Sequence, residues 1–225
     1  MIDVVGTGYE DALASLRTDI VAMGEAVLGR LADALDALTD RDLGLARTVA
    51  DGDAQINEMA LDIEATCLDL FGRQEPLAGD LRFVAASFKI VTDLERVGDL
   101  AVNLAEYTLS DVRDVGTEID AYGIGSAAQT LLGDALAAYE ADDPTACRTV
   151  AARDDDIDAR CQHASAQVVR DLLERDPDAW SVERVLDAVG TVLLTIRDLE
   201  RIGDHAVNIA ARTHFVLDGD PELIR

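Results

Sequence analysis

A thirteen-residue segment occurs twice in this chain, 105 residues apart, and this repetition restricts the fold to two similar units. The first copy, residues 93–105, reads DLERVGDLAVNLA, and the second, residues 198–210, reads DLERIGDHAVNIA. Ten of the thirteen positions are identical. A weaker match, with an offset of 101, pairs residues 47–57 with residues 148–158. Two matches in the same order indicate an internal duplication.

Helical periodicity dominates both units. Apolar residues recur at steps of three or four over about residues 8–39, 42–72, 79–110, 120–141, 143–175 and 180–217. This spacing predicts six amphipathic helices, with Asp40 or Asp42 as a cap and Pro144 in a first helical turn. No convincing strand pattern is present. We therefore expect an all-α fold of two tandem antiparallel three-helix bundles, residues 1–112 and 113–225, with a linker at 111–119.

The chain is strongly acidic, with 45 Asp and Glu residues, 19 Lys and Arg residues and a net charge of −26. Because the acids are spread along the whole chain, we favour adaptation to high salt, as in a halophile, over a functional acidic patch. Direct binding of nucleic acid is disfavoured, since it requires clustered basic residues. The three cysteines form no C-x-x-C pair, which fits a reducing cytoplasm better than a disulfide framework.

No targeting or membrane segment is expected. The chain starts Met1-Ile2-Asp3, without a basic region followed by an apolar one, and no apolar stretch approaches about 18 residues. The sequence therefore predicts a soluble, cytoplasmic protein without membrane insertion.

The repeated segment places oxygen-bearing side chains along one side of a helix. Glu95, Asp99 and Asn103 fall at about 0°, 40° and 80° around the axis. Carboxylates one turn apart, with Cβ atoms about 5–6 Å apart, repel each other unless a positive charge lies between them. Arg96 or a metal ion could supply that charge. A solvated face or structural salt bridges remain the alternatives.

The second helix of each unit carries a similar pair, Asp53 with Asn57 and Asp154 with Asp158. Adjacent antiparallel helices would bring these pairs to the acids of the third helix. Such an all-oxygen site suits Fe, Mn or Mg, and a zinc site built from Cys and His is not supported. Gly98 and Gly203 are unfavourable within helices, so we expect a neighbouring backbone or a ligand to pack closely there.

These segments resemble the paired signatures of the PhoU family. The stretch from Glu75 to Arg82 is similar to the family's turn into the same helix, and the resemblance covers essentially the whole chain. It implies two three-helix bundles related by a pseudo-two-fold axis. It also implies metal ions, often a multinuclear iron cluster, with Mn, Mg or Zn as other candidates. The implied ligands are Glu95, Asp99, Glu200 and Asp204, with Asp53, Asp154 and Asp158 as secondary candidates.

The resemblance further implies a cytoplasmic, non-enzymatic regulator of phosphate uptake and homeostasis. Such a protein restrains a phosphate ABC transporter through its ATPase, acts with a sensor kinase, and forms a homodimer. Because Asn57 stands where the second unit has Asp158, the first site is expected to bind metal less tightly. The second unit also lacks the turn at residues 75–82 and reads Pro177-Asp178-Ala179-Trp180 instead.

Three other functions stay open: a carboxylate-bridged metalloenzyme, a metal-storage protein and a structural helical adaptor. Di-iron oxidases use Glu-x-x-His pairs, and the chain has none. His205, which replaces Leu100 of the first copy, is expected to be a surface or core residue rather than a ligand.

Overall fold

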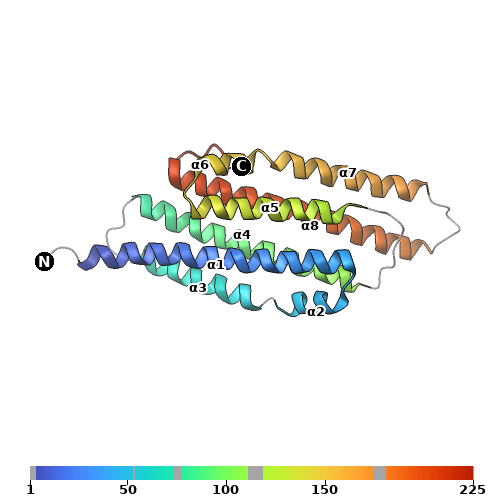
Figure 1. Ribbon diagram of the computed structural model, residues 1–225, viewed down its shortest axis with the longest axis horizontal. Helices are drawn as coiled ribbons and strands as arrows, with labels where there is room; N and C mark the ends of the chain where they lie inside the picture. Colours follow the sequence, from blue (N-terminus) through green and yellow to red (C-terminus); the bar gives the residue numbers. More distant parts are fainter. Residues whose placement is uncertain (1–3, 53, 73–77, 111–118, 175–180, 225) are drawn as a thin grey trace.

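The computed structural model describes residues 4–52, 54–72, 78–110, 119–174 and 181–224, and most of these residues are helical. The first repeat contains α1 (Val4–Asp40), α2 (Leu43–Asp51), α3 (Ala54–Phe71) and α4 (Ala78–Leu109). The second repeat contains α5 (Ala121–Glu140), α6 (Pro144–Ala151), α7 (Asp154–Leu173) and α8 (Val182–Asp218). No strand occurs within these ranges, which confirms the predicted all-α fold (Figure 1). The two copies of the repeated segment lie on equivalent helices, α4 and α8.

The predicted second helix of each repeat is divided in two, so the expectation of continuous helices over 42–72 and 143–175 was wrong. The Gly52 N–H bonds the Val49 carbonyl at 3.2 Å, and the Arg153 N–H bonds the Val150 carbonyl at 3.0 Å. These bonds reach back three residues instead of four, and such a tightened turn commonly ends an α-helix. The break places Asp154 at the start of α7.

The first helix of each repeat contacts the break. Arg30 of α1 donates to the Gly52 carbonyl. In the second repeat, Arg153 forms an ion pair with Asp134 of α5. Polar contacts that fix the break also fix where the following helix starts, and hence where its acidic residues lie.

Side-chain caps fix the starts of the short helices. The Asp42 carboxylate accepts from the N–H groups of Gly44 and Leu45, which confirms Asp42 as the cap of α2. Asp143 caps α6 in the same way, and Pro144 occupies its first turn as predicted.

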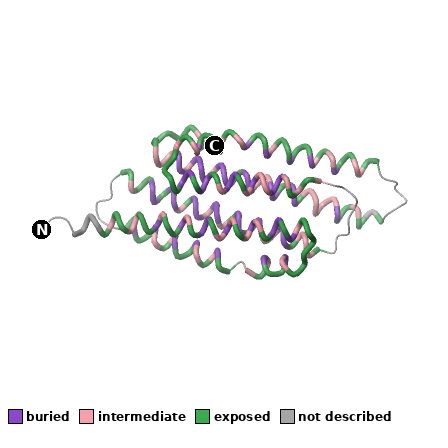
Figure 2. The backbone as a smooth tube through the Cα atoms, in the orientation of Figure 1, coloured by how far each residue is buried: buried purple, intermediate pink, exposed green. Residues whose placement is uncertain are grey.

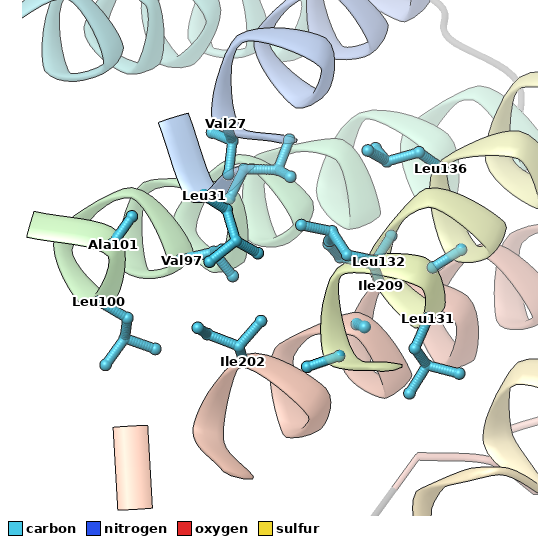
Figure 3. Close-up of a cluster of buried hydrophobic side chains, with 14 of the residues drawn as sticks. Val27, Leu31, Val97, Leu100, Ala101, Leu131, Leu132, Leu136, Ile202 and Ile209 are labelled. Carbon is cyan, nitrogen blue, oxygen red and sulfur yellow. The ribbon is translucent and has the colours of Figure 1, made fainter. Parts of the chain in front are cut away.

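The two bundles share one hydrophobic core. Helices α4 and α8 pack against each other, α1 packs on α4, and α5 packs on α8 and on α1. Figure 3 shows Val27 and Leu31 of α1, Val97 of α4, Leu132 of α5 and Ile202 of α8 in one cluster. Buried residues line the inner faces of these helices, whereas α3 and α7 expose their outer faces (Figure 2). The relative positions of the acids on α4 and α8 are therefore set by a common core.

Several predicted features lie outside the described residues. These are most of the linker at 111–119 with the 112/113 domain boundary, the turn residues 75–77, and the segment around Pro177. The division of the chain at 112/113 remains a prediction. Among the described residues, no helix is both long and apolar enough to cross a membrane.

Salt should stabilise this fold. The two repeats share one core, so a net charge of −26 creates repulsion within a single folded unit. Dissolved ions screen this repulsion, because the Debye length falls from about 10 Å at 0.1 M to about 3 Å at 1 M. We expect the melting temperature to rise steadily between about 0.1 and 3 M KCl. A melting temperature that stays flat or falls with KCl would contradict the interpretation of the acids as an adaptation to salt.

Candidate metal centre

Three aspartate carboxylates from α7 and α8 meet on one side of the second repeat, and Glu200 lies one turn from one of them on α8. Asp154 and Asp158 lie one turn apart at the start of α7, and Glu200 and Asp204 lie one turn apart on α8. Carboxylate oxygens of Asp154, Asp158 and Asp204 lie within 4.8 Å of one another. Asp154 is buried, Asp158 is half-buried and Asp204 is exposed. We call these four residues the acid cluster.

Electrostatics tie Glu200 to the same cluster. Burial raises its pKa, and the negative charges of Asp158, Asp204 and Asp154 raise it further. Burial and then Asp158 also raise the pKa of Asp204, while His205 and Arg201 act in the opposite direction. Glu200 and Asp204 therefore bind protons more readily than isolated carboxylates do, and any cation would relieve the same repulsion.

The donor set fits a cation that prefers oxygen. Metal–oxygen distances in protein sites are about 2.0–2.6 Å, so two oxygens on one ion lie at most about 4–5 Å apart. The separations between the three aspartate carboxylates fall within or close to that limit. Within the described part of the chain, Asp154, Asp158 and Asp204 are the group of three or more potential ligands that meets this criterion, and the group contains no His or Cys.

The acidic residues of the first repeat occupy the corresponding helices. Glu95 is half-buried and Asp99 is exposed on α4, and Asn57 of α3 takes the position of Asp158. Asp53, the counterpart of Asp154, lies outside the described residues. The first repeat thus has an amide where the second has a carboxylate. The prediction that its site is weaker remains a prediction.

A glycine–isoleucine contact sets the spacing of the helices in both repeats. A Cβ on Gly98 would lie 3.2 Å from Ile56 of α3, and a Cβ on Gly203 would lie 3.3 Å from Ile157 of α7. The expected close neighbour is therefore an isoleucine side chain, not a backbone or a ligand. Because Ile56 precedes Asn57 and Ile157 precedes Asp158, the contact brings the acid-bearing helices together in the same way twice.

The first aspartate of each repeated segment has a role that the sequence did not reveal. Asp93 is 2% exposed and crosses from α4 to the other repeat, where it contacts His205 Nδ1 at 2.9 Å and the Arg212 guanidinium. Burial, followed by the charges of Arg96 and Arg201, lowers the pKa of His205 to about 4. The imidazole is therefore neutral at pH 7, and its Nδ1–H donates to the carboxylate. His205 is a buried residue, as expected.

Asp198, the counterpart of Asp93 on α8, contacts residues of the first repeat. Its Oδ2 accepts from Tyr107 at 2.8 Å and from Asn103 at 3.2 Å, both on α4. Asn103 therefore donates across the repeat interface, instead of extending the stripe of Glu95 and Asp99 as the helical spacing suggested. The appearance of the same aspartate at the head of both segments is the sequence signal that could have pointed to this pair.

Metal binding to the acid cluster should weaken as pH falls, starting above the pH at which ordinary carboxylates protonate. The raised pKa values of Glu200 and Asp204 mean that protons compete with metal earlier than at exposed acids. In the metal-free protein, by contrast, the stability of the fold should increase as pH falls. A raised folded-state pKa contributes stability at low pH that is lost as pH rises through the folded value.

Equilibrium dialysis of metal from about pH 8 to about pH 4, paired with melting temperatures of metal-free samples, measures both effects. A bound fraction that stays constant over this range would argue against the acid cluster as the binding site.

The geometry defines a class of protein: a duplicated bundle of helices whose repeats each carry paired acids on the last helix. The sequence model of the PhoU domain matches this chain twice, over residues 20–108 and 123–213. The chain belongs to the PhoU family.

Relatives match over almost the full length of the chain. A "Phosphate-specific transport system accessory protein PhoU homolog" of Pseudomonas aeruginosa is 35% identical, over 94% of this chain and 86% of that protein. The Escherichia coli protein of the corresponding name is 28% identical over the same shares. The crystal structure of PhoU from Pseudomonas aeruginosa superposes with a TM-score of 0.84 and 33% identity, over 94% of this chain and all of that one. The match to full-length relatives confirms the fold and the resemblance inferred from the repeated segments.

Proposed function

We propose that this protein is a regulatory accessory protein of phosphate uptake. The observation that carries the proposal is the PhoU domain match to both repeats, including both acidic segments. Relatives named as accessory proteins of phosphate-specific transport systems match over 94% of the chain. By this proposal, the protein acts in the cytoplasm and restrains the uptake of phosphate when phosphate is plentiful.

The proposed partners are the ATPase of a phosphate ABC transporter and a sensor kinase that reports phosphate sufficiency. The third proposed partner is a second copy of the chain, with which it would form a homodimer. The relatives' name, which ties them to a transport system, supports the first of these.

The proposed cofactor is metal held by the acid cluster, with iron in a multinuclear cluster as the first candidate. Glu95 and Asp99, with Asp53, would form the weaker site of the first repeat. Support comes from the convergence of three aspartates, and from Glu200 and Asp204, whose pKa values are raised by burial and by the neighbouring negative charges. A bound metal would supply positive charge that draws α7 and α8 together.

A carboxylate-bridged oxidase or a metal-storage protein is the competing proposal, because the acid cluster consists of carboxylates from two helices. The lack of a histidine in that cluster, and the exposure of Asp204, make it unlike a di-iron site enclosed in a bundle core. Adding Fe(II) to the metal-free protein while recording dissolved oxygen separates binding from catalysis. Repeated turnovers of oxygen consumption would favour the enzyme.

The regulatory proposal predicts that cells lacking this chain take up labelled phosphate faster in phosphate-rich medium. The wild-type chain should restore slow uptake and should co-purify with the transporter ATPase. Uptake that is the same with and without the chain would contradict the proposal.

A further inference from the structure

A pocket of about 340 Å³ lies between the two repeats, outside the acid cluster. It is lined by Arg96, Asp99, Leu100, Val102 and Asn103 of α4 and by Arg201 of α8. Arg96 and Arg201 hold the same position in the two copies of the repeated segment, 105 residues apart. The pseudo-two-fold arrangement therefore brings one guanidinium from each repeat to a single pocket. We call it the arginine pocket.

The antiparallel packing of α4 and α8 accounts for this convergence. Asp93 meets Arg212 and His205, whereas Asp198 meets Tyr107 and Asn103, so the helices run in opposite directions and cross between these contacts. The two arginines lie on either side of that crossing.

The Arg201 side chain is partly exposed at the arginine pocket. Arg201 contacts Asp198 Oδ1 at 3.5 Å, and its side chain is 42% exposed. The other oxygen of Asp198 already accepts from Tyr107 and Asn103. Asp99 is the second acid at the arginine pocket. Two guanidinium groups held close together repel each other. An anion that lies between them relieves this repulsion.

We propose that the arginine pocket binds a phosphate group, with Arg96 and Arg201 contacting it from opposite repeats. A guanidinium presents five N–H donors in a planar fork that matches the oxygens of a tetrahedral oxyanion. The Asn103 side chain, on the same wall, is another polar contact for the anion. The geometry alone supports an oxyanion site at the arginine pocket. The choice of phosphate over other oxyanions rests on the proposed function. Because such a ligand would contact both repeats, phosphate binding would act directly on the interface between them.

Calorimetric titration of the chelator-treated full-length protein with inorganic phosphate, in about 0.15 M KCl, tests the proposal. The wild-type protein should bind phosphate, and Arg96→Gln and Arg201→Gln should each weaken binding roughly tenfold or more. Arg148→Gln is the matched control, because Arg148 is an exposed arginine paired with Asp218 elsewhere on the surface. This control should bind phosphate as the wild-type protein does. Helicity and melting temperature of each variant confirm that it is folded.

Two further titrations identify the source of the phosphate group. AMP that binds with the same dependence on both arginines assigns phosphate esters to the arginine pocket, whereas AMP that fails to bind restricts it to the free ion. Sulfate that binds as tightly as phosphate would overturn the assignment to phosphate.

The proposal is also overturned if the wild-type protein binds no phosphate up to about 10 mM, or if Arg148→Gln weakens binding as much as the pocket variants do. Binding that requires added metal and ignores the arginine variants would overturn it as well. None of these results bears on phosphate uptake in cells or on metal content, so the proposed function is tested separately.

Discussion

Neutralising Glu200 and Asp204 together should remove about half of the metal bound at saturation while leaving the helices intact. The double variant Glu200→Gln with Asp204→Asn keeps the size of both side chains but removes the two α8 carboxylates from the acid cluster. Without them, Asp154 and Asp158 alone remain on α7. The other half of the metal should remain at the site predicted in the first repeat. Metal content measured after saturation with metal and removal of the unbound ions gives the result.

The matched control neutralises the same amount of charge one helix away. Asp155 and Asp156 lie exposed in the first turn of α7 and are not part of the acid cluster. The variant Asp155→Asn with Asp156→Asn should therefore keep its metal. The metal-free Glu200 and Asp204 variant should melt higher than metal-free wild type, because like-charge repulsion is relieved. Unchanged metal content together with this higher melting temperature would mean that the acids are only a solvated face.

Replacing Asp93 by leucine should cost about 3–5 kcal/mol of unfolding free energy, as expected when one partner of a buried charge pair is removed. The change leaves the guanidinium of Arg212 and the N–H of His205 without their carboxylate at the centre of the repeat interface. For a chain of this length the melting temperature should fall on the order of 10 °C. Thermal and urea unfolding followed by circular dichroism measure the effect.

Two variants show whether charge pairing is the cause. Asp93→Asn keeps the shape and one acceptor, so its loss should be smaller than that of Asp93→Leu. Asp187→Asn removes an exposed acid on α8 and should change stability by no more than about 0.5 kcal/mol. If Asp93→Leu were as stable as Asp187→Asn, the contacts of Asp93 with His205 and Arg212 would contribute nothing to the fold.

Much of the fold could be predicted from the sequence because one signal was repeated. Apolar spacing identified the helices, and the copies at 93–105 and 198–210 placed the acids on equivalent helices. The proximity of Asp154 and Asp158 to Asp204 followed from two i, i+4 pairs on adjacent antiparallel helices.

Tertiary contacts account for what the sequence did not predict. The breaks after Asp51 and Ala151 keep the buried residues on the same side of the chain, since Val49 and Ile56 are both buried on either side of the first break. Asp93 looked like one acid among many, and its burial depends on Arg212, more than 100 residues away. Gly98 was recognised as a close approach, but only the packing identifies Ile56 as the neighbour.

Anomalous diffraction at the iron edge, from crystals grown without chelator, tests the metal centre most directly. We predict a peak between α7 and α8 within coordinating distance of Asp154, Asp158 and Asp204, with a weaker peak beside Glu95 and Asp99. Other edges extend the same measurement to manganese and zinc. If crystals contain metal by fluorescence but show no peak at the acid cluster, the acid cluster is not the metal site.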